Sequence, residues 1–147
     1  MDLNELYREV ILDHNRSPRN FGHVEPADAA ADGHNPLCGD RLHVTLRLQG
    51  DTVADVRFEG QGCAISVASA SLMSEAVKGK SRQDVSALYR QVHELLTGRA
   101  QPGAPDLGKL AALAGVAEYP MRVKCASLCW HTLNAALEHA PAAVSTE

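Results

Sequence analysis

Two neighbouring segments alternate apolar and polar side chains around a tight turn, and this pattern constrains the fold more than any other feature. Leu42–Leu48 carries an apolar residue at every second position, and Val53–Glu59 follows after the turn at residues 49–51. Such a pair predicts an antiparallel hairpin with one buried face, which other elements must cover. The second segment is expected to place three side chains on that face: Ala54, Val56 and Phe58.

The rest of the chain mainly has helical spacing. A first helix over residues 3–14 should end before Pro18, and a short strand fits near Ala27–Asp32. Residues 99–105 are expected to form a flexible loop. Four more helices are expected: Ala64–Lys78, Asp84–Thr97 with Ser81 as its cap, Leu107–Ala114, and Arg122–His139. This order predicts an α+β fold, a small antiparallel sheet of about three strands with helices packed on one face. We expect one domain over residues 1–147, with an ordered core of about 3–140.

Composition excludes several classes of function. Fourteen Lys and Arg against eighteen Asp and Glu give a net charge of −4, without the basic stripe that nucleic-acid binding requires. No apolar run approaches the roughly 18 residues of a membrane span, and the first residues lack the basic, apolar pattern of a signal peptide. We therefore expect a cytoplasmic protein with neither nucleic acid nor membrane as partner. In that compartment cysteines are metal ligands or reactive thiols more often than disulfides.

The chain has four cysteines, and three of them lie where elements begin. Cys38 lies in a polar turn just before a strand, and Cys63 follows Gly60-Gln61-Gly62 at the start of a helix. Cys125 is expected in the first turn of the last helix. A helix N-terminus favours a thiolate, so these settings suit reactive or ligating sulfur. Cys129 lies in an apolar helical stripe and is expected to be a buried core residue.

Asp40 follows Cys38 closely enough to direct its carboxylate to the same space. Three thiolates and a carboxylate form a tetrahedral ligand set that Zn²⁺ accepts. Spacing alone supports this set weakly, because the chain has no CxxC pair and Asp40 is equally well explained as a turn residue. A Cys/His nucleophile pair remains open, since His34 is near Cys38 in sequence. The motifs of serine hydrolases, zinc proteases and Walker-type phosphate loops are absent from the sequence.

Taken together, four segments resemble the U-type iron–sulfur assembly proteins, the IscU/NifU N-terminal-like family. These segments are residues 7–22, 35–40, 58–66 and 122–126. The resemblance implies a SufE/NifU-like fold over nearly the whole chain. Lys124 stands where the IscU-like scaffold branch has a histidine, so the sequence is more similar to the zinc-dependent SufU-type branch.

The resemblance also implies a function and a site. The zinc ligands would be Cys38, Asp40, Cys63 and Cys125. Cys38 would be the sulfur acceptor, and Arg122 would activate the site. The protein would be a sulfurtransferase-like accessory protein rather than a stand-alone enzyme. It would take persulfide sulfur from a PLP-dependent cysteine desulfurase of the SufS type and relay it to a downstream iron–sulfur scaffold complex.

Three alternatives remain open at this point. The same cysteines could hold a transient [2Fe–2S] cluster, which would make the protein a scaffold. A zinc or cysteine hydrolase would turn over a small substrate without any desulfurase. A purely structural adaptor would keep its partner-activating effect without Cys38.

Overall fold

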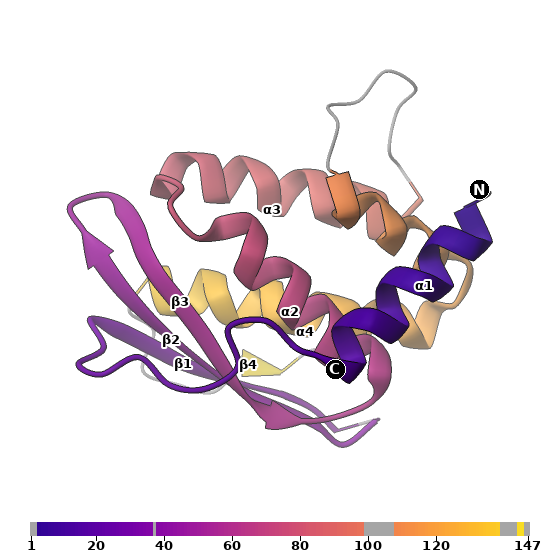
Figure 1. The fold of residues 1–147 in the computed structure, drawn as a ribbon, viewed down its shortest axis with the longest axis horizontal. Coiled ribbons are helices and arrows are strands. Elements are labelled where there is room, and N and C mark those ends of the chain that lie inside the picture. The colour runs from indigo at the N-terminus through magenta and orange to yellow at the C-terminus, as the bar shows by residue number, and fades with distance from the viewer. Residues whose placement is uncertain (1–2, 37, 99–107, 139–143, 146–147) are drawn as a thin grey trace.

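The computed structural model describes residues 3–36, 38–98, 108–138 and 144–145, and Figure 1 shows their arrangement. The expected loop at 99–105 and the expected helix end at His139 lie outside these residues. The elements in chain order are α1 (Leu3–Arg16), β1 (Ala29–Asn35), β2 (Asp40–Gln49), β3 (Thr52–Gln61), α2 (Ala64–Val77), α3 (Arg82–Leu96), the 3₁₀ helix η1 (Gly108–Glu118), α4 (Pro120–Leu137) and β4 (Val144–Ser145).

The predicted hairpin is present as β2 and β3, the centre and one edge of a sheet ordered β3-β2-β1-β4. One detail differs from expectation. The register shifts between Arg47 and Leu48, so that Leu48 pairs with Val53 and Arg47 with Asp55. Ala54 is therefore the extra residue of a β-bulge, and Val53 is fully buried in its place. A bulge reverses the alternation locally, which a strict period of two cannot predict.

The first strand also differs slightly from its predicted position. β1 runs from Ala29 to Asn35 and pairs antiparallel with β2 along its whole length. On its other side Gly33 and His34 pair in parallel with the two residues of β4. The sheet thus has the expected antiparallel strands and one short addition from the far end of the chain.

Helices cover one face of the sheet, as predicted (Figure 1). α4 packs on β1 and β2, and α2 packs on β3. At Gly33 a side chain would collide with Thr132 of α4, so the glycine permits a close approach of helix and strand. The apolar core between the two layers includes the fully buried Phe58, Leu46, Met73, Leu128 and Trp130.

The helix boundaries follow local signals with one consequence for the site. Ser81 caps α3, its side chain accepting a hydrogen bond from the Asp84 amide. α4 begins at Pro120 rather than at Arg122, because a proline suits the first helical position, where its missing N–H costs nothing. Cys125 therefore lies in the second turn of α4, not in the first as expected.

Candidate metal centre

Three chain segments meet at one end of the sheet, and each brings a cysteine. The β1–β2 turn carries Cys38, the β3–α2 junction carries Cys63, and α4 carries Cys125. These residues line one pocket of about 730 Å³. The sulfur atoms of Cys38 and Cys125 are 3.2 Å apart.

Asp40 ties this end of the sheet together. It is the first residue of β2 and is fully buried. Its Oδ1 accepts a hydrogen bond of 2.8 Å from the backbone N–H of Cys63. A side chain at Gly62 would place its Cβ only 2.5 Å from that oxygen, so the glycine makes room for the carboxylate. The expected proximity of Asp40 to the cysteines is thus present, and Asp40 is not merely a turn residue.

Cys63 is the N-cap of α2, as its position after the glycines indicated. Its Sγ accepts a hydrogen bond of 3.4 Å from the Ser66 backbone N–H. The N-terminal end of a helix carries partial positive charge, which stabilises a thiolate there. Cys63 is half-buried, so its sulfur is oriented by the helix but still borders the pocket.

Cys125 is the most buried of the three cysteines in this pocket. Burial raises the pKa of the Cys125 thiol, and hydrogen bonds with Cys38 and Asp40 raise it further. A buried thiolate beside a carboxylate and other sulfurs lacks a compensating positive charge. A bound cation would supply that charge, since metal coordination deprotonates thiols.

The donor atoms fit a metal ion. One ligand atom from each of Cys38, Asp40 and Cys125 lies within 4.8 Å of the others. In the part of the chain that the structure describes, this is the only His, Cys, Asp and Glu group of that kind. Thiolates and one carboxylate are a donor set that zinc accepts. Cys63 lies beside Cys125 in the same pocket and is available as a fourth ligand.

The pocket mouth is apolar and cationic. Leu12, Tyr119 and Met121 are large apolar side chains about half exposed, at 48%, 47% and 60%. Arg8 and Arg122 line the same pocket. The guanidinium of Arg122 lies 4.7 Å from the centroid of the Tyr119 ring, which holds the cation at the rim.

Cys129 lies outside the site, as its helical stripe indicated. It is fully buried, and burial raises the pKa of its thiol to about 12. Ser69 Oγ is 3.4 Å from its sulfur. Such a thiol is inert at neutral pH.

Among the described residues, no histidine joins the cysteines in a group of candidate ligand atoms. Gly33 faces α4, so the neighbouring His34 lies on the opposite face of β1, where it lines a separate groove with His43. This removes the structural basis for pairing His34 with Cys38. His131 is half-buried, and its Nδ1 lies 2.6 Å from the Tyr89 hydroxyl.

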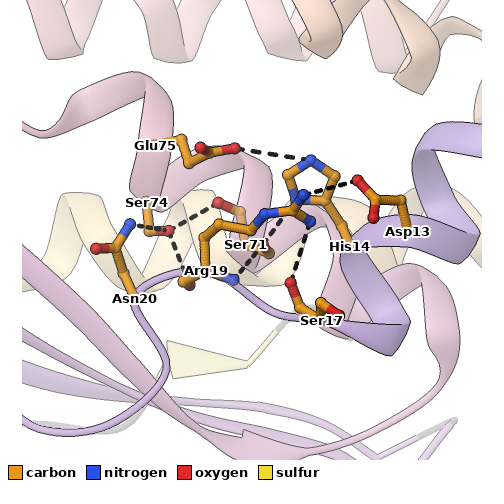
Figure 2. Close-up of polar contacts among 8 residues, drawn as sticks. All are labelled: Asp13, His14, Ser17, Arg19, Asn20, Ser71, Ser74 and Glu75. Atoms are coloured by element: carbon orange, nitrogen blue, oxygen red, sulfur yellow. Dashed lines mark hydrogen bonds and ion pairs between the residues drawn. The ribbon is translucent and has the colours of Figure 1, made fainter.

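Sequence reasoning missed His14, the buried centre of a polar cluster drawn in Figure 2. His14 is fully buried, and its Nδ1 is 2.7 Å from Ser71 Oγ. Ser71 Oγ also accepts a hydrogen bond of 2.8 Å from the Arg19 backbone N–H, so its own hydrogen is free for the imidazole. The missed signal is spacing: His14 follows Ile11 by three and Val10 by four residues, which places it on the apolar face of α1.

The same cluster joins α1 and the following loop to α2. Asn20 Nδ2 donates to Ser74 Oγ at 3.0 Å, and Arg19 forms a 2.7 Å ion pair with Asp13 (Figure 2). Glu75 approaches His14 Nε2 at 3.7 Å. Because α1 supplies Arg8 and Leu12 to the pocket, this cluster fixes one wall of the candidate metal centre.

Comparisons with known proteins give a consistent result. Residues 6–126 match the model of the NifU-like N terminal domain. The chain is 43% identical to the zinc-dependent sulfurtransferase SufU of Bacillus subtilis over 133 residues, 90% of each chain. It is 39% identical to the iron–sulfur cluster assembly scaffold protein IscU of Streptococcus pyogenes, over 92% of this chain and 85% of that one.

A solved structure agrees with these sequence matches. The crystal structure of a candidate iron–sulfur cluster assembly scaffold protein for the SUF system from Fervidobacterium islandicum superposes with a TM-score of 0.83. Its sequence identity is 35%, with coverage of 91% of this chain and 98% of that chain. Among the described residues, no helix has the length and apolar character needed to span a bilayer.

Proposed function

Because the chain belongs to the family of NifU-like N-terminal domains, we propose that it is a zinc-bound sulfur acceptor in iron–sulfur cluster assembly. It would take persulfide sulfur from a PLP-dependent cysteine desulfurase of the SufS type and pass it to a downstream scaffold complex. The ligands would be Cys38, Asp40, Cys63 and Cys125. Zinc at these residues would hold thiolates deprotonated without redox chemistry of its own.

One observation carries the proposal: Cys38, Asp40 and Cys125 converge with Cys63 in the same pocket, yet only one of the three cysteines is exposed. Asp40 and Cys125 are buried and Cys63 is half-buried, whereas Cys38 is exposed on the β1–β2 turn. A site built only to hold a metal has no need of an exposed ligand. A sulfur acceptor needs one, because the donor's persulfide must reach it.

The transfer itself requires no external oxidant or reductant. The Cys38 thiolate attacks the outer sulfur of the donor's persulfide, and a new S–S bond forms at Cys38. The S–S bond of the donor breaks, and its cysteine leaves as a thiolate. One sulfur atom moves between two thiolates, so charge and electrons balance.

Arg122 is positioned to assist this step. It lines the pocket with Cys38 and is held at the rim by the Tyr119 ring. A guanidinium there attracts an anionic persulfide and offsets the negative charge of the donor set. The half-exposed Leu12 and Met121 around it supply apolar area for contact with the desulfurase.

The scaffold function is the second candidate, because a relative of similar identity is named as a scaffold. The position before Cys125 distinguishes the two. Lys124 stands there, and a protonated ammonium group cannot ligate iron. The scaffold function therefore lacks a ligand that its own branch would supply, and we place sulfur acceptance first.

The proposal is tested by stimulation of a purified SufS-type desulfurase, measured as alanine released from cysteine. Wild-type protein should increase the rate of alanine release, and in Cys38→Ala this stimulation should be about tenfold lower or more. Cys129→Ala is the matched control and should retain most of it, because Cys129 is buried away from the pocket. Full stimulation by Cys38→Ala would overturn the proposal in favour of a structural adaptor.

A further inference from the structure

Asn35 forms hydrogen bonds with three of the four candidate ligand residues, which is more than the β1–β2 turn needs to form. It is the last residue of β1, pairs with Asp40 across the sheet, and is fully buried. Its Nδ2 donates to Asp40 Oδ2 at 3.4 Å and to Cys125 Sγ at 3.6 Å. Its backbone carbonyl accepts a hydrogen bond of 3.3 Å from the Cys38 N–H.

Packing alone does not explain an amide at this position. Asn35 Oδ1 is buried without a hydrogen-bond partner. A buried polar atom left unpaired costs about 1–3 kcal/mol, whereas an apolar side chain of the same shape would avoid that cost. The side chain is therefore best explained by what its amino group does.

We propose that Asn35 is a positioning residue that fixes Asp40 and Cys125 as the permanent ligands of the metal. This inference rests on the proposed function and extends it to a residue outside the ligand set. The amide bridges a carboxylate on β2 and a sulfur on α4, alongside the hydrogen bond between Asp40 and Cys125 themselves. Hydrogen bonds to ligands from outside the first coordination sphere fix their orientation.

The arrangement makes the four ligands unequal. Asn35 holds Asp40 and Cys125, and the Ser66 N–H holds the sulfur of Cys63. Among the described residues, the Cys38 sulfur lies within hydrogen-bonding distance of Cys125 alone, and Cys38 is exposed. Asn35 thereby determines that Cys38 is the ligand that exchanges when sulfur is delivered.

The test compares wild type with two variants of nearly the same shape, Asn35→Leu and Asn35→Asp. Zinc affinity is measured by competition with a chelator, and the visible spectrum of the Co²⁺-substituted protein reports the ligand set. Alkylation of the zinc-loaded protein by iodoacetamide, mapped by mass spectrometry, shows which sulfur exchanges. Asn134→Leu, an asparagine further along α4, is the control. Circular dichroism establishes that each variant folds.

We expect the zinc Kd to rise by about 10- to 100-fold in Asn35→Leu, as for other losses of an outer hydrogen bond. Asn35→Asp should lose at least as much, since two carboxylates would then face each other. In wild type Cys38 should be alkylated well before Cys125, and this order should weaken in both variants. Asn134→Leu should match wild type throughout.

Unchanged affinity, cobalt spectrum and alkylation order in a folded Asn35→Leu would overturn the inference. If that variant does not fold, Asn35→Ala, which also removes the donor, replaces it under the same criteria. Absence of zinc binding by the wild type would instead refute the proposed function. The inference would then be judged on the metal-free protein, where loss of the Asn35–Cys125 hydrogen bond should still speed alkylation of Cys125.

Discussion

At the residue scale, Asp40 connects the metal site to the fold. One of its oxygens accepts from the Cys63 N–H and the other from Asn35. Asp40→Ala should lower zinc affinity by about tenfold or more, while the folded state persists because β2 retains its backbone pairing. Equilibrium dialysis against zinc and thermal melting separate the two effects. An unchanged zinc content would remove Asp40 from the ligand set.

His14 gives the protein a pH dependence that has nothing to do with the cysteines. Burial lowers the pKa of His14, Arg19 lowers it further, and Glu75 and Asp13 oppose that shift. In the unfolded chain histidine titrates near pH 6.5. The unfolded chain therefore binds more protons just below that pH, and stability falls as the pH drops below about 6.5.

Urea unfolding between pH 8 and 5 measures this effect. His14→Gln should flatten the slope by up to about 1.4 kcal/mol per pH unit, the limit for one proton. Burial also lowers the pKa of His131. His131→Gln should therefore remove a separate part of the pH dependence of the unfolding free energy. A wild-type slope in His14→Gln would show that His14 is not the titrating group.

At the scale of elements, the packing of α1 against α2 depends on one serine of α2. Ser71 Oγ meets both His14 Nδ1 and the Arg19 N–H (Figure 2). Ser71→Ala leaves both groups without that partner and should cost about 1–3 kcal/mol of unfolding free energy. Hydrogen exchange should rise in α1 and in residues 17–20 before it rises in the sheet. Ser86→Ala, on the exposed face of α3, should change neither quantity.

A substitution at the junction of β3 and α2 should also have a large effect, but on zinc affinity rather than on stability. In Gly62→Ala the new methyl group would press on Asp40 Oδ1 and displace the carboxylate from the site. We expect zinc affinity to fall by about tenfold with little loss of helix content. Gly79→Ala is the contrasting control. Its φ of +86° strains any side chain, yet beyond its two chain neighbours no described residue has an atom within 4 Å of the new Cβ. It should cost stability and leave zinc affinity intact.

At the scale of the whole molecule, sequence periodicity was sufficient to predict the sheet and the helices that cover it. It was not sufficient to predict the contacts between them. The hairpin and the helices follow from alternation, helical spacing and glycine or proline at their ends. The bulge at Ala54 and the short β4 could not be predicted, because each depends on partners distant in sequence. His14 makes its hydrogen bond with Ser71 of α2, and Asn35 with Cys125 of α4. Both contacts depend on tertiary packing, so neither could be predicted from local sequence.

The candidate site shows the same division. Cys38 and Asp40 are neighbours in sequence, and the glycines before Cys63 indicated a helix start, so these features could be predicted locally. The convergence of Cys38, Cys63 and Cys125 could not, since no short spacing links them. Only the family resemblance anticipated it, and the fold then provides the physical reason: the β1–β2 turn, the β3–α2 junction and the start of α4 meet at one end of the sheet.

The metal content of the purified protein decides whether these residues hold zinc. Elemental analysis of the purified protein, together with its ultraviolet–visible spectrum, should give about one zinc per chain and no visible absorption, as for a d¹⁰ ion. Cys63→Ala and Cys125→Ala should lose that zinc, whereas Cys129→Ala should retain it. Iron with acid-labile sulfide and a visible band would contradict the account and establish the scaffold function instead.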